Sequence, residues 1–263
     1  MKILFFLILS INCLADTGFA YGNQNINDTE YAIHDFGFDK KIKNSKTIEL
    51  KFNRPDQFYT YFKNWKKSKS SDLLITEILN SRVTILVTDS LDRNIEGMMI
   101  TLDQLDKNLA DKIIKKTQLK ENSFLLLNNP VKYHVLTHEF QHYKDSKYDL
   151  ENKLIVQIKN AINSQVIDIQ NEMDLDFVNF LSLTIFEQRG YAVAADQILF
   201  NTKSQDMAID SILGFLTSYK SKIDPVLKNI ESTHIDIYKK IIDIIKKYQF
   251  NSNLSYLDLT KPL

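Results

Sequence analysis

The sequence predicts an α+β protein that is mostly helical, with a small α/β part followed by an all-helical C-terminal half. Glycine and proline are scarce, at 6 and 4 of the 263 residues, and neither occurs between Val131 and Arg189. Few residues therefore interrupt helices in the second half of the chain. Before that stretch, short apolar runs over residues 46–52 and 82–89 have the alternation or the length that is typical of strands.

Each element of the α/β part has its own signal. Alternation predicts the first strand, Pro55 fits the first turn of a helix, and later apolar runs have the length of strands. The aromatic residues that come after Pro55 at helical spacing are expected to pack in the core. The expected order is a strand over 46–52, a helix over 55–69, a helix over 72–81, a strand over 82–89, a loop that holds Gly97, a helix near 103–117 and a strand over 123–129.

The helical half is expected to begin at Asn129 and Pro130, because asparagine can cap a helix and proline fits its first position. Further along the chain, apolar residues recur at spacings of three and four. This periodicity predicts two more helices, over 206–220 and 224–249.

The domain organisation expected from the sequence is simple. Residues 21–45 are polar and poorly periodic, which predicts a leader segment. No repeat or low-complexity linker divides the chain after residue 45. Residues 46–263 are therefore expected to form one domain, with an α/β part over about 46–130 and a helical part over about 131–263.

Residues 1–20 have the pattern of a secretory signal peptide. Lys2 precedes an apolar run that is too short to span a membrane comfortably. Small residues at the positions that a signal peptidase reads predict cleavage near Ala15 or Ala20. The mature protein is expected to be exported, either periplasmic or secreted, without a transmembrane span.

The single cysteine, Cys13, lies inside or beside this segment. A lipid anchor on Cys13 is the alternative, but Asn12 stands where such anchors have a small residue, which favours export without lipidation. Cleavage at either alanine would leave a mature chain without a thiol, and so without a disulfide or a catalytic cysteine.

Charge and composition narrow the class of partner. Lys and Arg number 33, as do Asp and Glu, so the formal net charge is zero. A neutral chain gives no electrostatic case for binding nucleic acid or an anionic membrane. Hydrophobic residues make up 44% and charged residues 25% of the chain, which is ordinary for a soluble globular protein.

Three of the five histidines fall within nine positions, in the segment "HVLTHEFQH". On a helix, His138 and His142 lie on one face one turn apart, where both imidazoles can bind one zinc ion at about 2.0–2.1 Å. Glu139 is displaced around the helix, so it would stand beside the ion and accept a proton from the water that the ion activates. The sequence therefore predicts one Zn²⁺ site with Glu139 as general base. His134, one turn earlier, is expected to support the site or lie on the surface rather than bind the ion.

The run "SFLLLNNP" comes directly before the predicted helix that carries "HEFQH". Together these two segments resemble the zincin superfamily of zinc metallopeptidases, whose motif is HExxH. Members place an edge strand, which binds extended peptide, before the HExxH helix. The resemblance covers about residues 82–200. It implies a zincin-like α/β part with its edge strand over 123–129, a hydrolase activity, and a peptide or protein substrate.

A catalytic zinc site needs a third protein ligand. The metzincin branch fails because Tyr148 and Asp145 stand where it has a ligand and a glycine, and Asp145 is expected to be a supporting or surface carboxylate. The gluzincin branch uses a glutamate on a later helix, and both Glu172 in "NEMDLD" and Glu187 in "FEQRGYAVAADQ" are candidates. Glu187 is favoured because Gly190 and the nearby alanines would let its helix approach closely.

The sequence leaves two questions open: which residue stabilises an oxyanion, and whether the protein is an enzyme or a binding protein. Tyr191 and His234 are the candidates for stabilising an oxyanion. A second hypothesis, from another class, is an exported helical binding or interaction protein with a structural or non-catalytic metal site. A structural zinc needs four protein ligands, and His134 or Asp145 would have to supply the fourth from the same helix. The oligomeric state is not predicted.

Overall fold

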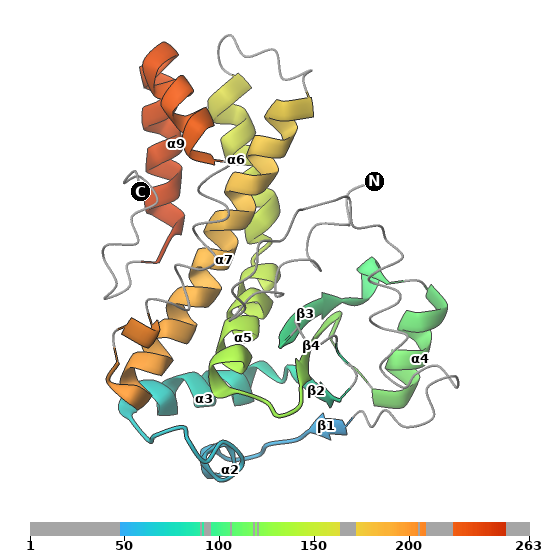
Figure 1. Ribbon diagram of the computed structural model, residues 1–263. Coiled ribbons are helices and arrows are strands. Elements are labelled where there is room, and N and C mark those ends of the chain that lie inside the picture. The colour runs from blue at the N-terminus through green and yellow to red at the C-terminus, as the bar shows by residue number, and fades with distance from the viewer. Residues whose placement is uncertain are drawn as a thin grey trace.

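The computed structural model describes residues 48–89, 91, 96–105, 107–117, 119, 121–163, 172–204, 206–208 and 223–250. Within these ranges the protein is α+β and mostly helical, with one four-stranded mixed sheet, as predicted (Figure 1). The predicted signal peptide, the polar leader and most of the helix expected over 206–220 lie outside the described residues. None of the described helices is long and apolar enough to cross a membrane.

The sheet has the strand order β1-β2-β4-β3. Its central pair, β2 and β4, is parallel, and β1 and β3 add to it antiparallel on either side. Because successive side chains point to opposite faces, Leu125 and Leu127 of β4 face one core cluster and Phe124 and Leu126 face another. The strands are β1 (Ile48–Leu50), β2 (Thr84–Thr88), β3 (Gly97–Thr101) and β4 (Ser123–Asn128).

The strand expected at the edge lies inside the sheet, so that prediction was wrong. β4 pairs with a strand on each side, and the continuous apolar run "FLLL" fits this buried position. The edge next to the motif helix is β3, which begins at Gly97 where a loop was expected. Glycine and methionine are not strong strand formers and "GMMIT" does not alternate, so its sequence carries no strand signal.

Three helices cover one face of the sheet and one covers the other. One apolar cluster joins the sheet to α2 (Pro55–Tyr61), α3 (Lys69–Ser81) and α5 (Tyr133–Lys147). A second cluster joins the opposite face to α4 (Lys107–Thr117), which follows the short 3-10 helix η1 (Leu102–Gln104) in the chain. The aromatic residues Phe58, Phe62 and Trp65 are buried, as predicted. α2 ends at Tyr61, earlier than expected, and Ser68 caps α3 by accepting a hydrogen bond from the Ser71 N–H at 3.1 Å.

The motif helix α5 begins at Tyr133, later than the predicted start at Asn129 and Pro130. Asn129 instead continues the pairing of β2 with β4, since its N–H donates to Thr88 O at 3.0 Å. Its side-chain amide donates to Asp89 Oδ1 at 2.6 Å. Both contacts hold Asn129 at the end of the sheet, and α5 begins only at Tyr133.

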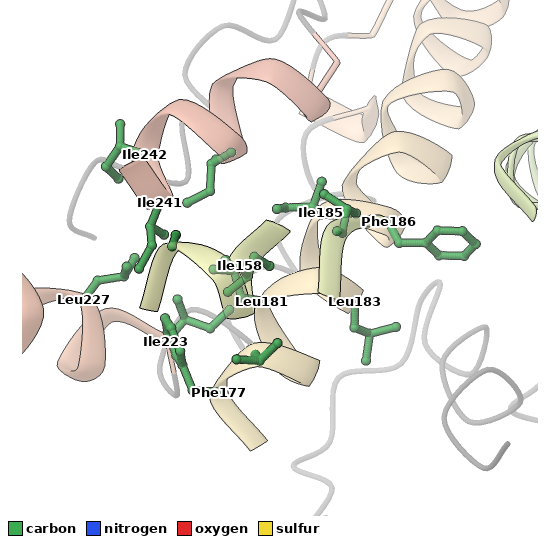
Figure 2. Packing of buried hydrophobic residues seen from close by; sticks show 14 of the residues in the cluster. Ile158, Phe177, Leu181, Leu183, Ile185, Phe186, Ile223, Leu227, Ile241 and Ile242 are labelled. Atoms are coloured by element: carbon green, nitrogen blue, oxygen red, sulfur yellow. The ribbon is translucent and has the colours of Figure 1, made fainter. Parts of the chain in front are cut away.

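The described part of the C-terminal half is helical, as predicted. It contains α6 (Leu150–Asn163), α7 (Glu172–Thr202), a helical segment over 223–233 and α9 (Ile235–Tyr248). Side chains such as Ile158, Leu181 and Ile241 join these helices in one apolar core (Figure 2). α7 also packs against α5, so this one helix connects the apolar core to the helix that carries the histidine motif.

Candidate metal centre

The motif lies on the part of α5 that is buried between the sheet and α7. Every residue from 135 to 143 is buried. On the sheet side the backbone of β3 comes very close, because a Cβ placed on Gly97 would lie 2.7 Å from Val135 Cγ1 and 3.1 Å from Glu139 Cγ. The glycine that opens the edge strand therefore makes room for the side chain of Glu139.

On the opposite side, α7 crosses α5 at a second glycine. A Cβ on Gly190 would lie 2.9 Å from His138 Nδ1 and 3.1 Å from His142 Cε1. The two helices can approach this closely only because Gly190 has no side chain, which is the reason the sequence suggested for a glycine there. The imidazoles are held by aromatic rings of α7: Phe186 stacks on His142 at 4.3 Å and Tyr191 meets His138 edge-on at 4.4 Å, both between ring centroids.

At this crossing the structure brings together His138, His142 and Glu187. The two histidine Nε2 atoms are 2.8 Å apart, and Glu187 Oε2 lies 3.2 Å from the first and 3.3 Å from the second. In a tetrahedral zinc site with bonds of 2.0–2.1 Å, neighbouring ligand atoms are about 3.3 Å apart. Within the described residues, no other group of three such side chains is placed to hold a metal ion.

The chemistry of the three atoms also fits a cation. At most one proton can lie between the two Nε2 atoms, and Glu187 Oε2 is buried without a well-formed hydrogen bond. Buried polar atoms are normally paired, and one positive ion at the centre of the triangle would contact all three. The His-His-Glu group can therefore hold a metal ion.

Burial and charge act in opposite directions on Glu187. Burial alone would raise the pKa of its carboxyl, but the neighbouring imidazoles of His142 and His138 outweigh it and lower the pKa to about 2. The side chain is thus a carboxylate, the form that binds metals. The exposed fractions of His138, His142 and Glu187 are 5%, 3% and 3%, and that of Glu139 is 2%, so water screens the site weakly.

The other candidate ligand, Glu172, is the first residue of α7. It lies about four helical turns before Glu187 along the same helix, on the order of 22 Å. The group of possible ligands that the structure brings together includes Glu187. The packing of α7 on α5 therefore supports the glutamate that the sequence favoured.

The two other histidines that the structure describes, His134 and His234, do not join the group. His134 contacts the ring of Tyr133, and burial, with smaller effects of Lys132 and His138, lowers its pKa to about 4, so it is neutral near pH 7. His234 precedes α9 and lines a hollow with Ile162 and Phe177. Phe177 is near the start of α7, so His234 is not brought to the crossing, whereas Tyr191 is.

Sequence reasoning missed a polar network beside the ligands. Asp145, expected to be a supporting or surface carboxylate, is buried and forms two hydrogen bonds with Arg189, each 2.8 Å long. Gln141 Nε2 also donates to Asp145 Oδ1, at 2.8 Å. An arginine within a largely apolar helix was the available signal, because its permanent charge needs a partner when it is buried.

These features define an α+β protein with a buried His-His-Glu centre that can hold a metal ion, next to a second glutamate and an edge strand. Comparison of the chain with protein-family models, with curated proteins and with solved structures finds no match. The site must therefore be interpreted from its own geometry.

Proposed function

We propose that this protein is an exported zinc metallopeptidase with a gluzincin-like site and a zincin-like arrangement of edge strand and motif helix. His138, His142 and Glu187 would hold one zinc ion. The observation that carries the proposal is that their three ligand atoms lie within 2.8–3.3 Å of one another. Glu139 directly follows the ligand His138 in the chain. The antiparallel edge strand β3, whose first residue Gly97 leaves room for the Glu139 side chain, supports the zincin-like arrangement.

A zinc ion bound by these residues would polarise the scissile carbonyl and lower the pKa of a water to about 7. Glu139 takes a proton from the water as its oxygen attacks the carbonyl carbon of the peptide. Glu139 then gives this proton to the amide nitrogen as the C–N bond breaks, which releases an amine and a carboxylic acid. To bind the metal, His138 and His142 must each present an unprotonated nitrogen, and Glu187 must be ionised.

The export assignment rests on the N-terminal sequence alone. With a formal net charge of zero, the partner that we propose is a peptide or protein substrate and not a nucleic acid.

The alternative is an exported helical binding protein with a structural or non-catalytic metal site. The observation that favours it is the burial of the three ligand side chains and of Glu139, each of which is 5% exposed or less. The number of ligands argues against this alternative, because a structural zinc needs four protein ligands and the described group contains three.

The first experiment is elemental mass spectrometry on purified residues 21–263 after loosely bound ions have been removed. We expect about one zinc per chain, and cleavage of a peptide library by the loaded protein. Glu139→Gln should keep the zinc and lose turnover by about 10²–10⁴-fold. A binding protein would keep its zinc and its ligand binding in this variant. A chain that takes up no zinc would rule out both the zinc peptidase and the zinc site.

A further inference from the structure

The end of α9 is held by the two residues that come after the ligand Glu187. Gln188 forms two hydrogen bonds with the backbone of Phe250, one to its oxygen at 3.2 Å and one from its N–H at 3.0 Å. Arg189 Nη1 donates to Tyr248 O at 2.7 Å, and its guanidinium lies over the Phe250 ring at 4.0 Å. We call Gln188, Arg189, Tyr248 and Phe250 the C-terminal clasp.

The clasp reaches the motif helix through Arg189. Its guanidinium forms the ion pair with Asp145, which lies one turn beyond His142 on α5. Arg189 therefore joins its own helix α7, which carries the third ligand, both to α5, which carries the other two, and to the end of α9. The clasp is also fixed to α6, since Gln157 Nε2 donates to the Tyr248 hydroxyl at 2.5 Å.

We propose that the C-terminal clasp positions the metal site, with Gln188 and Arg189 as its positioning residues. A helix is stiff over one turn, so fixing these two residues fixes the rotation of α7 and with it the direction of the Glu187 carboxylate. The pair with Asp145 sets the distance between α5 and α7 just beyond the ligands. By linkage, binding of the metal and closure of the clasp stabilise each other. The inference rests on the metal site proposed above.

The test measures zinc affinity and thermal stability separately, in the full mature chain. Arg189→Lys keeps the charge but loses the two-pronged contact with Asp145, and Gln188→Ala removes the bonds to Phe250 and leaves Arg189 in place. We expect the zinc Kd, measured by competition with a chromophoric chelator, to rise about 10–100-fold in Arg189→Lys and less in Gln188→Ala. Added zinc should also raise the Tm of both variants less than it raises the Tm of the wild type.

The matched control is Trp65→Phe, which removes a buried 3.0 Å hydrogen bond to Gln197 on the same helix, α7. It should lower the Tm of the metal-free protein and leave the zinc Kd unchanged. If the clasp variants lose stability as this control does but keep the wild-type zinc Kd, the clasp does not position the metal site. The peptidase proposal would still stand. A wild-type chain that binds no zinc would overturn both. If Arg189→Lys does not fold, the Gln188→Ala result decides.

Discussion

α7 takes part in two helix packings that differ in kind. Against α6, in the apolar core that α9 also joins, it buries side chains such as Leu181 and Ile185. These side chains fill space, and none of them needs one particular polar partner. Against α5 it presents Gly190 and Glu187, which both meet His138 and His142, and Arg189, which pairs with Asp145. Apolar cores tolerate changes that conserve volume, whereas paired buried polar groups do not. We therefore expect substitutions in the first packing to lower stability alone, and substitutions in the second to lower metal affinity.

The largest effect on the α5 packing should come from the third ligand. We expect Glu187→Ala to weaken zinc binding by more than about 100-fold, beyond the usual effect of residues that only support ligands. Glu172→Ala, about four turns earlier on the same helix, is the matched control and should bind zinc as the wild type does. Isothermal titration with zinc would measure both, and equal losses in the two variants would contradict the assignment of Glu187.

In the apolar packing, Leu181→Ala should lower the free energy of unfolding by about 2–5 kcal/mol, because the side chain is fully buried and leaves a cavity. Denaturant titration of the metal-free protein would measure the loss. The zinc Kd of the folded variant should stay within about twofold of wild type. A large change in Kd would mean that the two packings of α7 are coupled.

Gly190→Ala tests the close approach of α5 and α7. The added methyl would lie 2.9 Å from His138 Nδ1, so the imidazoles or the helix must move. We expect the zinc Kd to rise about 10–100-fold, while the gain in helix propensity, about 1 kcal/mol, offsets part of the cost of overpacking. Chelator competition would show the change, and wild-type affinity would show that the crossing can relax.

The smallest effect should come from Glu151 at the start of α6, outside both packings. Burial, and then the charge of Asp149, raise the pKa of its carboxyl from 4.5 to about 7. The folded protein therefore holds this proton more tightly than the unfolded chain, and stability falls as the pH rises from about 4.5 to about 7. Glu151→Gln should be more stable than the wild type by about 1–2 kcal/mol at pH 8, a value discounted for partial exposure. Thermal unfolding at pH 4 should show no difference, and zinc affinity should not change.

Local signals in the sequence predicted most of the helices and the motif. The spacing of His138 and His142 needs only the geometry of one helix turn, and the absence of glycine and proline between Val131 and Arg189 fits the helices α5 to α7. Gly190 marked the closest approach to α5 because a glycine inside a helix is costly without such a reason. These inferences worked because each depends on residues that are neighbours along the chain.

By itself the sequence therefore determined an α+β, mostly helical protein and the histidine and glutamate side chains that can meet a metal ion. Only the tertiary structure decided that β4 is central and β3 is the edge, that α5 starts at Tyr133, and that Arg189 joins Asp145 to the end of α9. Periodicity and capping are set within a few residues. Strand order and buried ion pairs are set between segments far apart in the chain, where many pairings satisfy the same local pattern and only packing selects one.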